Sequence, residues 1–284
     1  MLYKARKDMN MRSTSTKPFF ATVCAVAMSA SLFACGSNGN TSAVEANATT
    51  AEQTYGAVAS PSGKADAKKS EGVMSYAEYD AAKVDDAVTI EAYVQAKQAW
   101  YEDKASLYLQ DNDGGYFVYS ASCSKNDYKK LDVGQKVKVS GYKSEWSGEN
   151  EIGEDATIEI EDGTFVAAPI DATPLLGTDG LVSHQNQRVS FANMTVVASK
   201  DADGKDAPFV YKYDGSGTEG DDLYFKASDG KDAYTFTVES DLCDKSSDVY
   251  QGVTKLKVGD TISMEGFLYW YEGVNPHVTS ITIH

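Results

Sequence analysis

The chain contains one unit twice within residues 75–284, and this repeat restricts its fold more than any other feature. The closing segments of the two copies, 131–158 and 256–283, align without a gap over 28 positions. In this register Trp146 falls on Tyr271, and Gly148 falls on Gly273. The alignment predicts two consecutive domains that share one fold.

Each copy carries short segments in which apolar and polar residues alternate, separated by Asp-Gly and Gly turns. This period of two is typical of half-buried strands. The first strand of each copy is expected at 88–94 and 189–196, the second at 107–109 and 223–225, and the third at 116–119 and 234–238. A cysteine and a polar segment that suits a short helix follow in both copies. A short helix is also expected before each first strand, opened by a Ser75–Glu78 capping box in one copy and by Pro174 in the other.

The Leu-x-Val-Gly-x-x-Val-x-Val-x-Gly stretch at 131–141 resembles the fourth strand of the oligonucleotide/oligosaccharide-binding (OB) fold. The resemblance covers about residues 73–165 and 173–284, with the boundary near 166–172. It implies an all-β protein with short helices, built as two tandem five-stranded OB-like Greek-key barrels after a disordered N-terminal tether. The arrangement is similar to tandem lipoproteins of Gram-positive gut bacteria, and it implies no catalytic motif.

The first 34 residues resemble a lipoprotein signal peptide. A basic head precedes the uncharged run 19–34, which is shorter than the roughly 20 residues of a membrane-spanning helix. The run ends at Leu32-Phe33-Ala34-Cys35, which resembles a lipobox and predicts an acyl anchor on Cys35 at the extracellular face of the cell membrane. The alternative is an ordinary secretory signal with Cys35 incidental. Residues 35–72 are small and polar, and they predict a disordered linker.

After removal of the signal peptide, the chain holds 41 Asp and Glu against 21 Lys and Arg, a formal charge of −20. Such a field repels polyanions, and nucleic-acid affinity rests on neutralising phosphates. The charge therefore disfavours a nucleic-acid partner, and it suits a soluble monomer.

The residues that usually carry chemistry form no catalytic pattern, so no enzyme is expected. His184, His277 and His284 have neither metal nor triad spacing, and no cofactor is predicted. Asp-Gly loops such as 111–114 and 201–206 raise the question of weak calcium binding, but turn chemistry explains them. No metal site is predicted. Cys123 and Cys243 suit one disulfide or two buried thiols equally.

Aromatic residues are the candidate ligand-binding group, because the loops between strands one and two and between strands four and five flank the ligand face of this fold. The candidates are Trp100, Tyr101, Trp146, Tyr269, Trp270 and Tyr271. Their rings suit stacking on sugars or bases. The alternative is that they pack across a barrel mouth or between the two domains.

The leading hypothesis is a non-catalytic, lipid-anchored surface protein that binds an oligosaccharide or a protein partner at these aromatics. The second is single-stranded nucleic-acid binding, for which the first domain supplies only a partial basic stripe: Lys125, Lys129, Lys130, Lys136 and Lys138. The third is a structural or assembly lipoprotein with its aromatic clusters buried between the domains.

Overall fold

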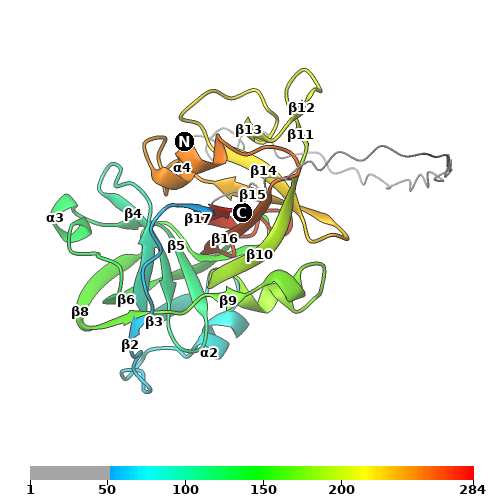
Figure 1. Ribbon diagram of the computed structural model, residues 1–284. Helices are drawn as coiled ribbons and strands as arrows, with labels where there is room; N and C mark the ends of the chain where they lie inside the picture. Colours follow the sequence, from blue (N-terminus) through cyan, green and yellow to red (C-terminus); the bar gives the residue numbers. More distant parts are fainter. Residues whose placement is uncertain (1–51) are drawn as a thin grey trace, which may run out of the picture. The chain divides into compact units, whose positions relative to one another are not determined.

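The computed structural model describes residues 52–284 as a mostly β structure (Figure 1). Two closed five-stranded barrels follow one another along the chain, as the repeat predicts. The predicted signal peptide 1–34, the predicted lipidation site Cys35 and the first part of the predicted linker lie outside the described residues.

The first barrel places a short helix between its third and fourth strands. Its strands are β3 (Ala87–Lys97), β4 (Lys104–Gln110), β5 (Gly115–Ser122), β6 (Gln135–Trp146) and β8 (Thr157–Val166), with helix α3 (Lys125–Tyr128). Antiparallel pairs join β3 to β4, β4 to β5, β6 to β8 and β3 to β6. The parallel contact Ser122–Thr157 between β5 and β8 closes the barrel. Strand β7 (Glu149–Ile152) lies in the loop between β6 and β8.

The second barrel repeats this order of pairing. Its strands are β10 (Arg188–Val197), β14 (Leu223–Ser228), β15 (Ala233–Val238), β16 (Thr261–Phe267) and β17 (His277–Ile283), with helix α4 (Asp248–Val253). The parallel contact Thr237–His277 closes it. The loop between β10 and β14 is longer than its counterpart and carries β11 (Ser199–Lys200), β12 (Asp206–Ala207) and β13 (Phe209–Tyr211). The predicted fold class is confirmed.

Short helices precede both barrels, in agreement with the sequence. Helix α2 (Tyr76–Ala81) begins with the predicted capping box, in which Ser75 and Glu78 bond reciprocally. Before the second barrel lie two short 3-10 helices, η1 (Thr173–Leu175), with Pro174 in its first turn, and η2 (Leu181–His184). Strand β9 (Ile170–Asp171) precedes η1 and pairs in parallel with β10.

Each barrel has its own apolar core, formed by the inward-facing residues of its strands. Ile90, Leu107 and Leu109 are fully buried in the first barrel. Phe225 and Phe236 are fully buried in the second. Two separate cores indicate that the repeat encodes two self-contained barrels.

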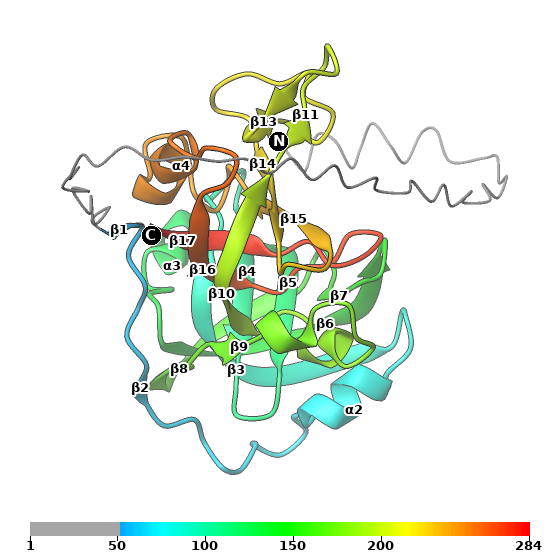
Figure 2. The ribbon, with the colours of Figure 1, turned by 45° about the vertical axis from the view of Figure 1, so that its right-hand side comes forward.

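The segment 52–72 is ordered, so the prediction of a disordered linker up to residue 72 is wrong for this part. Strand β1 (Gln53–Tyr55) pairs with β17 of the second barrel, and β2 (Ser62–Gly63) pairs with β8 of the first. Figure 2 shows this segment running from β1 past β2 to α2. We call residues 52–72 the strap. Its apolar anchor is Tyr55, which is 9% exposed and belongs to the core of the second barrel.

Charged side chains fasten the strap to the first barrel. Lys136 lies 3.0 Å from Asp66 of the strap, 3.2 Å from Glu91 and 3.0 Å from Glu161. Burial opposes the charge of Lys136, but these carboxylates outweigh it and raise its pKa. Lys69 of the strap donates to the carbonyl oxygen of Glu91 at 2.7 Å. Patterns of apolar residues in the sequence do not reveal such a segment, because polar contacts hold it to the first barrel.

Cys123 and Cys243 are both free thiols, so they do not form the disulfide that was one of the two alternatives. Burial raises the pKa of Cys243 to about 12, which keeps it protonated and unreactive. Within residues 52–284, no helix has the length and apolar character needed to cross a bilayer.

Replacing Tyr55 by Ala is expected to lower the free energy of unfolding by roughly 2–4 kcal/mol, because it removes a buried ring and leaves a cavity. The ring lies against Gly252 of α4, where an added Cβ would come within 2.5 Å of the Tyr55 Cγ atom. Urea unfolding measures the change. Tyr142→Ala is the control, since Tyr142 is 62% exposed. Equal unfolding midpoints for the two variants would show that the strap contributes nothing to stability.

Candidate functional site

The ligand face of an OB barrel is the outer surface of its second and third strands, flanked by the loops between strands one and two and between strands four and five. In the first barrel this face belongs to β4 and β5, with flanking loops 98–103 and 147–156. In the second barrel it belongs to β14 and β15, with flanking loops 198–222 and 268–276. The two faces differ in whether they are covered.

The second barrel covers the face of the first. Tyr108 and Phe117 point outward from β4 and β5, yet they are only 0% and 2% exposed. The ring of Phe267 stacks on Tyr108 with centroids 4.4 Å apart at 14°, and Tyr269 meets Phe117 edge-on at 5.5 Å. The end of β16 and the following loop thus occupy the place of a stacked ligand.

A buried histidine completes this aromatic interface. His277 stacks on Tyr269 with centroids 4.2 Å apart, and its Nδ1 atom lies 2.9 Å from the Tyr108 hydroxyl. Burial lowers the pKa of His277 to about 3, so the imidazole stays neutral. Tyr269, predicted to bind ligand, is 4% exposed and is an interface residue instead.

The loops that carry the predicted tryptophans of the strand 4–5 region, Trp146 and Trp270, are joined by backbone contacts. The Trp270 backbone N–H donates to Glu149 Oε2 at 2.8 Å, and the Glu272 N–H donates to the Ser147 carbonyl at 2.7 Å. Gly148 has a φ of +90°, and a Cβ there would lie 2.9 Å from Trp270. Trp146 and Trp270 are both half-buried, which favours the packing alternative over a free ligand platform.

The two residues of the other predicted pair, Trp100 and Tyr101, differ. The Trp100 ring is held by its contacts, whereas the Tyr101 ring is exposed. The Trp100 indole N–H donates to the Cys123 carbonyl at 3.0 Å, and the Lys125 ammonium lies 5.2 Å from the ring centroid. Tyr101 is 58% exposed. Trp100 therefore braces the start of α3, while Tyr101 remains accessible at the first barrel's loop.

The face of the second barrel is only partly covered and carries three tyrosines, of which Tyr224 is half-buried. Tyr224 points outward from β14, Tyr213 comes from loop 198–222 and is 77% exposed, and Tyr271 comes from loop 268–276 and is 37% exposed. Burial raises the pKa of Tyr224, and the neighbouring Asp222, Glu239, Tyr271 and Tyr213 raise it further. The three rings are therefore neighbours, and we call them the tyrosine face.

Tyr271 is the only residue of the tyrosine face that the sequence predicted to bind a ligand. Tyr224 was placed within a strand, but its outward direction depends on the register with β15. Tyr213 lies in an insertion that the first copy lacks. An insertion bearing aromatics in a ligand-flanking loop was the signal that could have found it.

Two carboxylates lie beside Tyr224, the half-buried Asp222 and the buried Glu239. Asp222 accepts hydrogen bonds from the Ser240 backbone N–H at 2.9 Å and the Ser240 hydroxyl at 2.7 Å. Glu239 accepts from the Gln98 amide of the first barrel at 3.0 Å. Burial raises the pKa of Glu239 to about 8, assisted by the charges of Asp222 and Asp241. Glu239 is therefore mostly protonated at neutral pH.

The Asp-Gly loops hold their backbones through turn hydrogen bonds. Asp111 Oδ1 accepts from the backbone N–H groups of Asp113 and Gly114 at 2.8 and 2.9 Å. Asp201 Oδ1 does the same for Asp203 and Lys205. Over residues 52–284, no group of three or more His, Cys, Asp or Glu side chains is placed to hold a metal ion.

Comparison with protein-family models gives no match, and comparison with curated proteins gives none either. Solved structures with similar folds include a murine DNA-binding protein bound to double-stranded DNA, at 12% identity and a TM-score of 0.33, covering 68% of this chain and 93% of that one. A replication protein A heterotrimer bound to single-stranded DNA has 14% identity and a TM-score of 0.28, covering 72% and 51%. The p202 HIN1 domain with a 12-mer double-stranded DNA has 14% identity and a TM-score of 0.31, covering 71% and 94%. Scores this low leave the ligand of this chain open.

Replacing Glu239 by Gln is expected to stabilise the protein at alkaline pH. The folded-state pKa of about 8 exceeds the ordinary 4.5, so stability from this group is present at low pH and is lost as the pH rises between these values. As the pH rises from 5 to 9, the free energy of unfolding of the variant should therefore increase relative to that of the parent by on the order of 1–3 kcal/mol. Thermal unfolding at a series of pH values measures this, with the exposed Glu272→Gln as control. Parallel pH profiles for Glu239→Gln and the parent would contradict the assignment.

Proposed function

We propose that the chain is a non-catalytic binding protein whose ligand lies across the tyrosine face of the second barrel. The observation that carries this proposal is the asymmetry of the two OB faces. The first is filled by Phe267 and Tyr269, whereas the second presents rings from its strand and from both flanking loops. In this fold, ligands bind where such loops meet the second and third strands.

A neutral oligosaccharide suits this face best. Tyrosine rings offer apolar faces for sugar rings and hydroxyls for hydrogen bonds. Asp221 and Glu272 lie in the two flanking loops, and the formal charge of the whole chain is −16. Carboxylates accept hydrogen bonds from sugar hydroxyls but repel phosphates. A protein partner remains the alternative occupant within this proposal.

Single-stranded nucleic acid is the second candidate ligand. Lys226 is exposed on the same outer side of β14 as Tyr224, and Lys212 adjoins Tyr213 in the loop. Aromatic rings beside cationic side chains suit stacked bases and their phosphates. The lysine stripe considered for the first barrel is weaker than its sequence suggests, because three carboxylates neutralise Lys136.

Replacing Tyr213 or Tyr271 by Ala is expected to weaken ligand binding by roughly 5- to 100-fold each, from the loss of about 1–3 kcal/mol per stacked ring. Glycan and oligonucleotide arrays, followed by calorimetric titration of the hits, measure the effect. Tyr142→Ala, an exposed tyrosine of the first barrel, is the matched control.

Salt separates the two ligand classes. Affinity for an oligonucleotide falls steeply with rising salt, while affinity for a neutral glycan changes little. Unchanged binding in both Tyr213→Ala and Tyr271→Ala would exclude the tyrosine face as the binding site.

We further propose that the protein is anchored by lipid at Cys35 on the extracellular face of the cell membrane. The support is the basic head, the short apolar run and the Leu-Phe-Ala-Cys tetrapeptide, in which Phe33 is bulkier than usual. An acyl anchor contributes about 0.8 kcal/mol per buried methylene, so several chains hold a protein durably. The third hypothesis, an assembly lipoprotein, shares this anchor.

Cys35→Ser is expected to abolish incorporation of labelled palmitate and to move the protein from the membrane fraction to the medium of a Gram-positive host. The physical reason is the loss of the acyl attachment atom, Sγ. Cys24→Ser, within the apolar run, is the control and should keep its label. Labelling that persists in Cys35→Ser would rule out the anchor.

A further inference from the structure

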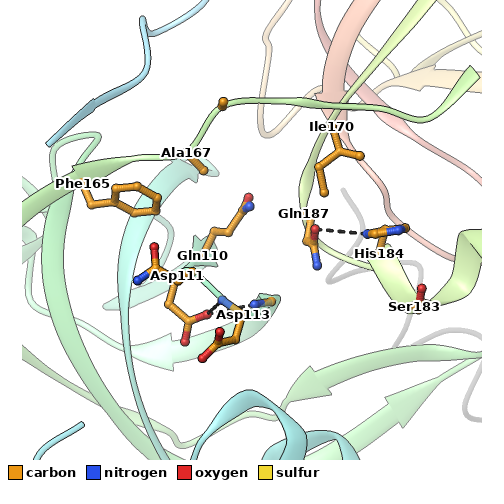
Figure 3. Close-up of a pocket in the computed structure, with 12 residues that line it drawn as sticks. Gln110, Asp111, Asp113, Phe165, Ala167, Ile170, Ser183, His184 and Gln187 are labelled. Carbon is orange, nitrogen blue, oxygen red and sulfur yellow. Dashed lines mark hydrogen bonds between the residues drawn. The ribbon is translucent and has the colours of Figure 1, made fainter. Parts of the chain in front are cut away.

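A cavity of about 440 Å³ lies where the two repeats meet, away from the tyrosine face. Its walls come from the turn between β4 and β5, from the segment that follows β8, and from η2 with the residue Gln187 after it (Figure 3). We propose that this junction pocket binds a small neutral polyhydroxylated molecule, such as a monosaccharide or disaccharide.

The first wall is a rigid turn whose inner carboxylate is already satisfied. Besides its turn bonds, Asp111 accepts from the Tyr116 hydroxyl at 2.9 Å and pairs with Lys69 of the strap at 2.5 Å. Its charge is thereby compensated. The neighbouring Asp113 carboxylate lies at the exposed rim of the pocket, where it can accept hydrogen bonds.

The opposite wall is fixed to the first barrel by amide side chains. Gln185 donates to the Gly148 carbonyl at 2.8 Å, and Asn186 donates to the Asn150 carbonyl at 3.0 Å. His184 Nδ1 lies 3.3 Å from Gln187 Oε1, which leaves His184 Nε2 for another partner. The wall is therefore held before any ligand arrives.

A buried amide group is directed into the pocket between these walls. Gln110 is 6% exposed, and its Oε1 atom accepts from the Arg188 backbone N–H at 2.8 Å. Its amide nitrogen donates to no residue within 52–284. Figure 3 shows the side chain directed between Ala167 and Gln187. This nitrogen faces the open pocket, where it can donate to a ligand oxygen in place of water.

The lining selects the ligand chemistry. It holds no Lys or Arg, and Asp113 at the rim disfavours phosphates and carboxylates. Phe165 and Ile170 supply an apolar wall, while Gln, Asn, Ser and His side chains both donate and accept hydrogen bonds and the Asp carboxylates accept them. One apolar face with convergent polar groups is what a sugar ring requires, and the volume lies within the range of small-molecule sites.

The pocket joins both repeats, so a bound sugar should also stabilise the packed barrels. Any ligand that binds only the folded state raises the unfolding temperature, and the rise grows as the ligand concentration exceeds the dissociation constant. This property gives a second readout besides direct titration.

The test uses the full chain and a panel of glucose, galactose, N-acetylglucosamine and maltose, with gluconate as the anionic probe. Saturation-transfer NMR and thermal shift are expected to detect at least one neutral sugar and not gluconate. Ala168→Trp, which fills the pocket from its exposed rim, and His184→Ala should each weaken binding at least tenfold.

Asp232→Ala is a control outside the pocket and should keep full binding, because Asp232 lies in the equivalent turn of the second barrel, where Asp229 accepts from its backbone N–H at 2.8 Å. Tyr213→Ala separates this site from the tyrosine face, and it should leave pocket binding intact. Binding of no neutral sugar, equal binding of gluconate, or full binding by Ala168→Trp would each overturn the proposal. Loss of the signal in Tyr213→Ala alone would assign it to the tyrosine face instead.

Discussion

The stacking of Phe267 on Tyr108 is the contact on which the arrangement of the two barrels depends. It places an aromatic ring of the second barrel on the ligand face of the first, at a distance and angle typical of a bound ligand ring. Tyr269 and the neutral His277 extend the contact, and the Tyr108 hydroxyl reaches the imidazole. Because aromatic pairs add directional energy to the burial of a large apolar area, this interface sets the register between the barrels.

The strap also holds the two barrels together. Tyr55 enters the core of the second barrel, while Asp66 and Lys69 join charged groups of the first. One short segment therefore crosses both barrels, with apolar burial at one end and ion pairs at the other. The ion pairs are partly buried, where the effective dielectric is lower and each hydrogen-bonded charge counts for more than on an open surface. Their geometry also positions Asp111, and with it one wall of the junction pocket.

The two copies of the repeat have diverged in what their outer faces do. In the first copy, Tyr108 and Phe117 bind another part of the same chain. In the second copy, a longer loop brings Tyr213 beside Tyr224 and Tyr271 on a face that stays exposed. Under the function proposed above, the first barrel serves structure and the second serves recognition. The pocket at their junction is lined by residues that neither copy holds alone.

The sequence was sufficient to predict the local structure. The alternation of apolar residues, the Asp-Gly turns and the Ser75 capping box predicted both barrels, since these signals act over a few residues. It also selected Tyr271 and the strand 4–5 aromatics, but it left open whether they line a ligand face or a domain interface. The burial of Tyr269, the place of Tyr213 and Tyr224 in the tyrosine face and the order of the polar strap follow from the packing of the folded chain. The burial of Tyr269 and the pairing of the strap with β17 and β8 depend on contacts between segments more than a hundred residues apart. The tyrosine face depends on the register between β14 and β15 and on a loop insertion. The free energy of such contacts comes from shape and charge complementarity, which no local pattern records.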